Sequence, residues 1–539
     1  MKQSLLFQQK NLLTIILVLV FLWSLRVIDW KEPLLHPGGG TTFLQIIEAM
    51  IHPDLSPDIL LLALDSAWVT ITYAVAGMTI AIVIAVLFGV LASGVLQSSQ
   101  NTFSSLSNSF FRAFLGFLRA IHELVWALLF VAAFGLTPYS AILAIAIPYG
   151  GILGRIFADM LSDVKNEPIQ SLQSTGASKW QLLFYGYFPL VKANMISYTM
   201  YRFECAVRSS AVMSFVGLGG LGYQIQLSLD DLNYEEVWTF VLFLMAIVLV
   251  IDGWSSQWRS RLAKRSSRFS LLSFFISFAL VVGSWLYLYM IEHASFFTLF
   301  TDENGQYAKK FFLSLLGIGE DSPAFFSAQS WLHILQLSYD TLMMSIIAIG
   351  IATIVMLITV VPAARNVANG KLTMSRSPFH WVSFLLIRAS YILSRAVPEL
   401  IWAMMIIFIF QPGILPGAVA LALHNFGILG KLCAEVIEDL DERPIRHLSS
   451  SGASHAQILL YGVIPSVLPK FLSFILYRWE VIMRTTIVVG FVGAGGLGQQ
   501  FKLSMSYFHY SDITLIILCY LLLVWLSDFL SELSRKAAN

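Results

Sequence analysis

The 539-residue chain has few charges and few cysteines, and both features limit the kinds of partner and site that the sequence can support. Only 12% of its residues are charged, 57% are hydrophobic, and the formal net charge is +1. This balance gives no support for nucleic acid as a bulk electrostatic partner. The three cysteines, Cys205, Cys433 and Cys519, lie in apolar stretches without CxxC or Cys/His spacing, so neither a disulfide framework nor a zinc site is indicated.

Motifs for nucleotide binding and catalysis are also missing. No GxxxxGK[ST] sequence occurs, so the chain has no phosphate-cradling loop with which to hydrolyse ATP. The GxGxxG formed by Gly217, Gly219 and Gly222 follows an apolar run and not a strand, which argues against a nucleotide site. No His/Cys/Asp cluster supplies a nucleophile or a metal site. The sequence therefore predicts a non-enzyme without a cofactor or metal of its own.

Apolar runs, in contrast, are abundant. The mean hydropathy of +0.75 exceeds what a soluble core of this length could bury. Crossing the hydrocarbon layer takes about 20 apolar residues in a helix. Six runs in each half of the chain approach or reach this length, which predicts an all-α, polytopic membrane protein with about twelve spanning helices. These runs are 12–27, 68–96, 114–134, 140–158, 187–216, 237–251, 271–291, 337–361, 394–410, 418–437, 463–492 and 513–530.

The first run has two possible interpretations. Lys2 and Lys10 precede it, as they would in a cleaved signal sequence. The stretch Leu22-Trp-Ser-Leu-Arg26 offers no small-x-small cleavage site, which favours a retained helix.

A block of about fifty residues occurs twice at a fixed offset of 276 positions, which identifies two copies of one folded unit. We therefore expect two six-helix repeats, at residues 1–262 and 263–539. The matching segments are Ser174-Thr-Gly-Ala-Ser178 with Ser450-Ser-Gly-Ala-Ser454, Tyr201-Arg-Phe-Glu204 with Tyr477-Arg-Trp-Glu480, and Phe215–Gly222 with Phe491–Gly498.

The distribution of Lys and Arg predicts the orientation. The connection between the sixth and seventh runs is basic, whereas the connection at 217–236 has no Lys or Arg and four acids. Cytoplasmic loops of membrane proteins carry an excess of Lys and Arg, so we expect the basic connection to be cytoplasmic. Counting the predicted spans from this connection places both termini on the same side. The same residues could simply anchor the link to anionic lipid. The basic residues are Arg259, Arg261, Lys264, Arg265 and Arg268; Lys165, Lys179, Arg443 and Arg446 agree with this orientation, and Lys309 and Lys310 oppose it.

One predicted cytoplasmic connection in each half has a glycine followed thirteen residues later by a proline. Glycine permits a tight corner and proline suits a helix start, so a short amphipathic docking helix is expected between them. The spacing resembles the "EAA loop" of permeases of ATP-binding-cassette (ABC) importers, which fits a cleft in the ATPase. A plain interhelical turn without a partner is the alternative. The candidate docking residues are Gly176, Ala177, Ser178, Pro189, Gly452, Ala453, Ser454 and Pro465.

The two loops depart from that family's pattern at two positions. The first glutamate of the motif is replaced by Gln170 in one half and Arg446 in the other. The usual isoleucine, ten residues after the glycine, is replaced by Gly186 and Gly462. We therefore expect the two halves to grip their ATPases differently.

A narrower resemblance lies on either side of these loops. Arg119-Ala-Ile-His-Glu-Leu-Val-Trp126 and Arg395-Ala-Val-Pro-Glu-Leu-Ile-Trp402 resemble the "RAxPExxWA" stretch of phosphonate-type permeases. The segments 175–222 and 451–498 are similar to "TGAS…YGxxP…YRxExxxR…GxVGAGGxG" of the same family. The chain is thus identified as a fused, duplicated permease resembling members of the phosphonate-type ABC importers.

This resemblance implies the type I importer permease fold in the bacterial inner membrane. It also implies two separate ATPase subunits that bind ATP and Mg, and a periplasmic or lipid-anchored substrate-binding protein. The implied cargo is phosphonate or a related phosphorus oxyanion, phosphite or phosphate. A secondary transporter of a small anion is the alternative, but the few intramembrane acids each have a basic neighbour four residues away. A membrane enzyme is the third class.

The fifth apolar run of each half contains charges, which are costly in hydrocarbon and must face protein or water. Glu204 with Arg208, and Glu480 with Arg484, are spaced to pair on one helix face, which leaves Arg202 and Arg478 as surplus cations. One hypothesis is an anion pathway set by these four arginines, since guanidinium matches phosphorus oxyanions. The other is a structural ion-pair cluster. For Glu123 with Arg119, and Glu399 with Arg395, we expect structural pairing.

Glycines follow each fifth run on the predicted outer side. Such density permits positive φ and close backbone crossing. An external gate and simple close helix packing are both compatible with this pattern. The candidate gate residues are Gly217, Gly219, Gly220, Gly222, Gly493, Gly495, Gly496 and Gly498.

Overall fold

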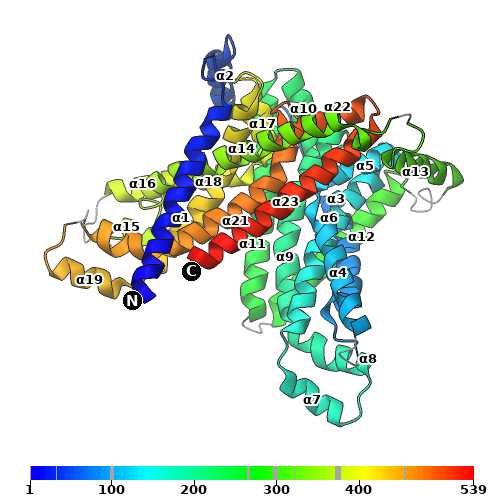
Figure 1. Ribbon diagram of the computed structural model, residues 1–539, viewed down its shortest axis with the longest axis horizontal. Coiled ribbons are helices and arrows are strands. Elements are labelled where there is room, and N and C mark those ends of the chain that lie inside the picture. Colours follow the sequence, from blue (N-terminus) through cyan, green and yellow to red (C-terminus); the bar gives the residue numbers. More distant parts are fainter. Residues whose placement is uncertain are drawn as a thin grey trace. The chain divides into compact units, whose positions relative to one another are not determined.

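The computed structural model describes residues 2–31, 33–97, 102–263, 267–294, 301–320, 322–370, 378–454 and 457–538 (Figure 1). Regular secondary structure in these ranges is helical, and the β-pairing found there is one isolated bridge between Leu35 and Phe410. The predicted all-α class is confirmed. Lys264 and Arg265 of the basic connection lie outside the described residues.

The chain forms two compact units: a central unit, residues 48–313, and a terminal unit, residues 1–47 together with 314–539. Helices α2 (Gly39–Ile51) and α13 (Asp302–Leu315) lie where the chain passes from one unit to the other. The central unit contains α3 (Pro57–Ser93), α4 (Thr102–Ala120), α5 (Glu123–Phe134), α6 (Pro138–Ser162), α7 (Asn166–Ser174), α8 (Lys179–Gln181), η2 (Leu182–Tyr187), α9 (Phe188–Met213), η3 (Ser214–Val216), α10 (Leu221–Asp230), α11 (Tyr234–Ala263) and α12 (Ser267–Met290).

The terminal unit repeats most of this order. It contains α1 (Lys2–Ser24), η1 (Leu25–Val27), η5 (Ala324–Phe326), α14 (Ala328–Thr359), α15 (Arg365–Ala368), α16 (Pro378–Ala396), α17 (Glu399–Ile407), α18 (Ile414–Glu438), α19 (Glu442–Ser450), η6 (Ile458–Val463), α21 (Ile464–Gly490), α22 (Gly496–Ser506) and α23 (Tyr510–Ala538).

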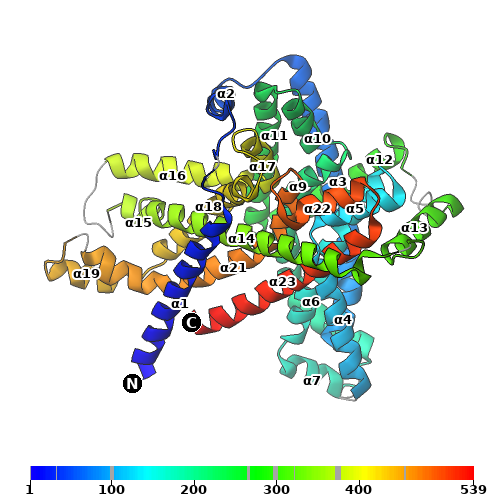
Figure 2. The same ribbon diagram turned by 45° about the horizontal axis from the view of Figure 1, so that its top comes forward.

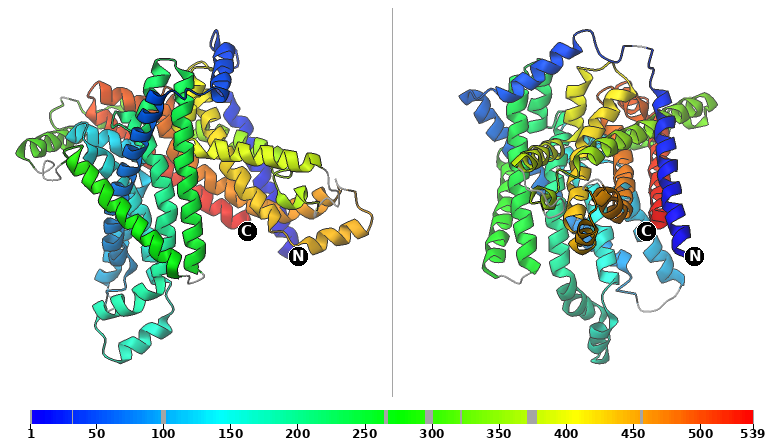
Figure 3. Two further views of the ribbon diagram at one scale, coloured as in Figure 1. Left: turned by 180° about the vertical axis from the view of Figure 1, so that it is seen from behind. Right: turned by 90° about the vertical axis from the view of Figure 1, so that its left-hand side faces the viewer.

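The compact units differ from the sequence repeats 1–262 and 263–539 by an exchange of first helices. Helix α1 packs on α14 and α23 of the terminal unit, and Figure 3 shows it beside α23. The Trp23 indole Nε1 donates to the Tyr339 hydroxyl at 3.3 Å. Helix α12 packs instead on α3 and α11 of the central unit. Each compact unit therefore takes its first apolar helix from the other half of the sequence.

Eight of the described helices are long and apolar enough to span a membrane, and three bent pairs raise this to eleven. The bent pairs are α4 with α5 at 87°, the α9 segment with α10 at 45°, and α16 with α17 at 94°. The apolar part of α1, Leu12–Val27, is shorter. The eight spans, the three bent pairs and this shorter helix correspond to the twelve predicted runs. Two of the predicted runs, 114–134 and 394–410, are broken by bends of 87° and 94°.

Small residues allow the long helices to pack closely. Helices α3 and α6 pack along each other in the central unit, and a Cβ added at Gly77 would lie 2.8 Å from Ile145. A Cβ at Gly150 of α6 would lie 2.7 Å from Ile84 of α3. The hydrophobic effect contributes little to association between helices in lipid, so close van der Waals packing at such small residues holds the helices together.

Candidate functional site

The predicted docking loops form the same helix-turn-helix corner in both units. Gly176 after α7 and Gly452 after α19 have φ of +84° and +81°, a region that glycine adopts without strain. In the central unit, Gln181 N–H donates to the Ser178 hydroxyl at 3.4 Å, and Ser178 N–H donates to Gln181 Oε1 at 2.8 Å. Ser454 and Gln457 repeat both bonds at the same lengths. The Gly-Ala-Ser sequence therefore ends one helix and caps the next.

The helix that starts at this corner runs directly into the fifth spanning helix. We expected a separate short helix between the glycine and the proline; the structure instead has one helical segment from Lys179 to Val216. Its start contains a six-residue π-helical turn, η2, in which Phe188 N–H bonds to the Leu183 carbonyl five residues back. The wider turn lets the helix continue into Pro189, which lacks an N–H. In the terminal unit η6 and α21 form the same continuous segment, 458–490, around Pro465.

The glycines that replace the usual isoleucine have a packing reason. A Cβ at Gly186 would lie 2.9 Å from Cδ1 of Ile169 on α7. A Cβ at Gly462 would lie 3.0 Å from Cδ1 of Leu448 on α19. The missing side chain lets α7 and α19 fold back against the helices that follow them.

The outer surfaces of the two corners differ between the units. Tyr185 and Tyr461, at the same offset, are both 74% exposed. In the central unit the exposed rings of Trp180 and Phe184 stack with centroids 6.2 Å apart, whereas Leu460 stands at the Phe184 position. Figure 2 shows α7 at the end of the central unit away from α10.

Acidic and basic side chains cluster around the fifth helix of the terminal unit. Arg484 donates to Glu480 at 2.8 Å and to Asp528 of α23 at 2.8 Å. Arg535, also of α23, lies 3.5 Å from Glu480 and above the Tyr477 ring. Two acids and two arginines balance, so this cluster adds no net charge to the helix bundle.

The central unit has the same four residue types at the same offset. Arg208 donates to the buried Glu204 at 2.9 Å. Asp252 and Arg259 occupy the α11 positions that match Asp528 and Arg535. Sequence reasoning used Arg259 only for the orientation and missed the other three residues, although their common spacing of 276 positions was a usable signal. The pairing of Arg208 and Arg484 with carboxylates favours a structural role for these two arginines.

Arg202 and Arg478 make a different kind of contact. Arg202 donates through Nε and Nη2 to the Tyr198 hydroxyl, at 3.0 and 2.7 Å. Arg478 donates through the same two nitrogens to Oδ1 of Asn425 on α18, with the Nε bond at 3.0 Å. A neutral oxygen holds a guanidinium in place without bringing an opposing charge.

In each unit a histidine lies close to the glutamate at the helix break, but the two histidines do not occupy equivalent sequence positions. At the α4–α5 break, His122 caps α5 by accepting from Leu124 N–H, and its Nε2 lies 3.7 Å from Glu123. At the α16–α17 break, Nε2 of His424 lies 3.5 Å from Glu399. The exchange is reciprocal: Pro398 stands at the His122 position and Pro148 at the His424 position.

The glutamate at the first break is also tied to the fifth helix. Glu123 accepts a hydrogen bond from the Ser209 hydroxyl of α9, and Ser209 is 2.9 Å from the Tyr149 hydroxyl of α6. The expected pairing of Glu123 with Arg119, and of Glu399 with Arg395, stays a prediction. The observed contacts place both glutamates where broken and continuous helices meet.

The glycine-rich segments form tight turns at the ends of the fifth helices opposite the docking corners (Figure 1). Six of the eight glycines have positive φ, from 68° to 96°. The hydroxyl of Thr70 accepts from Leu221 N–H at 3.0 Å, and that of Thr341 accepts from Leu497 N–H at 2.9 Å. The six are Gly217, Gly219, Gly220, Gly493, Gly495 and Gly496.

The remaining two glycines lie in the first turns of α10 and α22, where the backbone crosses the end of the preceding helix. A Cβ at Gly222 would lie 1.9 Å from the Ala211 carbonyl oxygen, and one at Gly498 would lie 2.1 Å from that of Ile487. Since these obstacles are backbone atoms, no side chain fits without moving a helix.

Removing the carboxylate from the central cluster tests its structural role. Glu204→Gln leaves the Arg208 charge without this partner in a largely buried position, and we expect it to destabilise the protein by about 3–5 kcal/mol. The measurement is thermal unfolding of the purified protein in detergent. Glu532→Gln, which breaks an exposed pair with Lys536, is the control and should change little. Equal small effects of both variants would contradict the structural role.

Adding one methyl group tests the close crossing. Gly222→Ala should lower stability by about 1–3 kcal/mol, because the new Cβ must displace a helix. Gly253→Ala in α11 is the matched control, since nothing lies within 4 Å of its Cβ. Both are measured by the same unfolding assay. A Gly222→Ala protein as stable as the control would contradict the described crossing.

Comparison with known proteins identifies the family. The model of the family described as "Binding-protein-dependent transport system inner membrane component" matches residues 85–287 and 372–539, which is more than half of the chain. A chain of the MetNI methionine ABC transporter in an inward-facing conformation is 18% identical with a TM-score of 0.35, covering 40% of this chain and 99% of that chain.

Two curated relatives show how far the similarity extends. The phosphate-import permease protein PhnE of Mycolicibacterium smegmatis is 27% identical over 506 residues, 92% of this chain and 89% of that protein. The phosphite transport system permease protein PtxC of Stutzerimonas stutzeri is 38% identical over 219 residues, 40% of this chain and 75% of that protein. The chain is therefore a multi-pass membrane protein that belongs to the family of inner-membrane components of binding-protein-dependent ABC importers, with the family's domain present twice.

Proposed function

We propose that this chain is the whole translocation path of an importer for a phosphorus oxyanion: phosphate, phosphite or a phosphonate. The similarity that carries this proposal runs through 92% of the chain to a protein named as a phosphate-import permease. The shorter relative is named for phosphite, which contains the same kind of oxygen ligands. Fusion of two permease repeats lets one polypeptide supply both sides of the path.

Arg202 and Arg478 are the side chains that attract the anion. Both belong to fifth helices, and both are held by neutral oxygens from Tyr198 and Asn425. Guanidinium presents paired N–H groups that suit the oxygens of phosphate and phosphonate. Arg208 and Arg484 bind carboxylates instead, so they stiffen the helices that form the path.

The energy comes from two separate ATPase subunits that dock at the Gly176 and Gly452 corners. Since each corner continues without a break into a fifth helix, movement of the docked ATPase shifts that helix as a rigid rod. These corners and both chain termini lie on the cytoplasmic side, in agreement with the basic residues around them.

The glycine turns at the other ends of the fifth helices form the external gate. A periplasmic or lipid-anchored binding protein delivers the anion there. The turns are fixed to α3 and α14 through Thr70 and Thr341, so a tilt of the fifth helix must be shared with these neighbours.

Reconstitution tests the function directly. We expect liposomes containing the permease, its ATPases and its binding protein to take up phosphate, phosphite or a phosphonate only with ATP inside. Arg202→Gln and Arg478→Gln should each reduce uptake about tenfold, the loss of one charge-assisted contact, without preventing assembly. Lys536→Gln, which removes one charge at a 71% exposed side chain, is the control. Uptake by the permease alone, without ATPase, would contradict the proposal and favour a secondary transporter of a small anion.

Docking is tested by shortening an exposed ring at each corner. Tyr185→Ala and Tyr461→Ala should each weaken binding of the ATPase about tenfold, because aromatic side chains dominate such contacts. The measurement is the affinity of purified ATPase for the permease in nanodiscs. Tyr307→Ala on α13 removes a similarly exposed ring elsewhere and should have no effect. Unchanged affinity in both corner variants would exclude these corners as the docking sites.

A further inference from the structure

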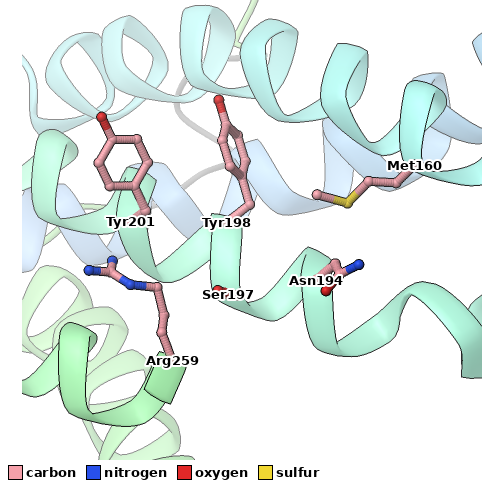
Figure 4. A pocket seen from close by; sticks show the side chains of 6 residues that line it. All are labelled: Met160, Asn194, Ser197, Tyr198, Tyr201 and Arg259. Carbon is pink, nitrogen blue, oxygen red and sulfur yellow. The ribbon is translucent and has the colours of Figure 1, made fainter. Parts of the chain in front are cut away.

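A hollow of about 380 Å³ lies beside α9 in the central unit (Figure 4). It has room for a small solute with several water molecules. Its lining comes from three helices: α6 contributes one residue, α11 one, and the part of α9 nearest the docking corner four. The six residues are Met160, Asn194, Ser197, Tyr198, Tyr201 and Arg259.

The polar groups of this hollow offer several hydrogen-bond donors and no carboxylate. Tyr198 accepts two hydrogen bonds from Arg202, so its own hydroxyl proton remains to be donated. Accepting bonds from a cation strengthens that hydroxyl as a donor. Ser197, Asn194 and Arg259 add further N–H and O–H groups, and none of the six lining residues is acidic. Donors gathered without a carboxylate suit a ligand that only accepts, such as an oxyanion.

Two positive charges converge on one ring at the edge of the hollow. The guanidinium carbons of Arg202 and Arg259 lie 5.4 and 5.9 Å from the centre of the Tyr201 ring. Figure 4 shows Arg259 extending from α11 toward α9. Its hydrogen bond goes to the neutral Ser255 hydroxyl at 2.7 Å. An anion placed beside Tyr198 and Arg259 would reduce the repulsion between these arginines.

The equivalent place in the terminal unit is built differently. Phe474 stands at the Tyr198 position and has no hydroxyl. Arg535, at the Arg259 position, lies 3.5 Å from Glu480, which offsets its charge. Lys470 replaces Asn194. The combination of a phenol donor with an arginine held by a neutral partner is therefore found in the central unit and is not repeated at these positions of the terminal unit.

We propose that this hollow binds a phosphate-class oxyanion and joins α9 to α11 through it. The ligand bridges the Tyr198 hydroxyl of α9 and the Arg259 guanidinium of α11. Its phosphate group belongs either to a free anion, the imported solute after release, or to the headgroup of an anionic lipid. The identification of the free anion as imported solute rests on the function proposed above; the binding chemistry does not.

The test measures binding to the complete importer in detergent, in two arms. One arm measures equilibrium binding of radiolabelled inorganic phosphate; the other measures retained phosphatidylglycerol by native mass spectrometry. We expect Arg259→Gln to weaken one of these signals at least about tenfold, the loss expected for a charge-assisted hydrogen bond. Tyr198→Phe, which copies the terminal unit, should weaken the same signal. Arg261→Gln, the same charge change at an exposed position of α11, should leave it unchanged.

The arm that responds identifies the source of the phosphate group. A wild-type importer that shows neither signal would overturn the proposal, and so would signals that Arg259→Gln and Tyr198→Phe leave unaltered. Thermal unfolding of each variant separates a lost site from a lost fold. Uptake into liposomes is measured independently on the wild type. If the variants lose binding but the wild type takes up no phosphorus oxyanion, the binding site stands and the proposed function alone is refuted.

Discussion

The continuity of the fifth helix past its proline is the constraint on which the proposed mechanism depends. An α-helical turn at Pro189 or Pro465 would leave a carbonyl without its donor and would press the ring against the preceding turn. The π-helical turns η2 and η6 avoid this by bonding five residues back, so that one helix reaches from the docking corner to the glycine turn. Gly186 and Gly462 let the preceding helices pack against this segment, since Ile169 and Leu448 fill the space that a side chain would take.

The charged side chains of the fifth helix also need compensation, because this helix lies in an apolar bundle. The carboxylate–arginine clusters on the fifth and last helices provide it with equal numbers of acids and bases in the terminal unit, and the central unit has the same residue types at the same positions. In addition to these clusters, Arg202 and Arg478 donate hydrogen bonds to the neutral oxygens of Tyr198 and Asn425. The reciprocal His and Pro exchange shows that the two halves have diverged in side chains while keeping one imidazole beside each glutamate at a helix break.

Much of the fold could be predicted from sequence because apolar length and repetition are local signals. The apolar runs, the two copies and the glycine corners were all found in this way. The exchange of α1 and α12 between units was not, because no local pattern records which partner a hydrophobic helix selects. The π-helical continuation past Pro189 was missed because proline normally signals a helix start. Asp528 and Arg535 were overlooked, and Arg259 was used only for the orientation, because the sequence does not show which helix these residues face; their contacts with the fifth helix do.

The rigidity of the fifth helix is the central claim, and a distance measurement tests it most directly. Spin labels at positions 180 and 216, both inside the continuous segment Lys179–Val216 and near its two ends, would be compared in the complete importer with and without trapped ATP. The account predicts the same distance distribution in both states, because the segment moves as one rod. A change of about 5 Å, one helical turn, would show that the helix breaks or extends during the cycle and would contradict the account.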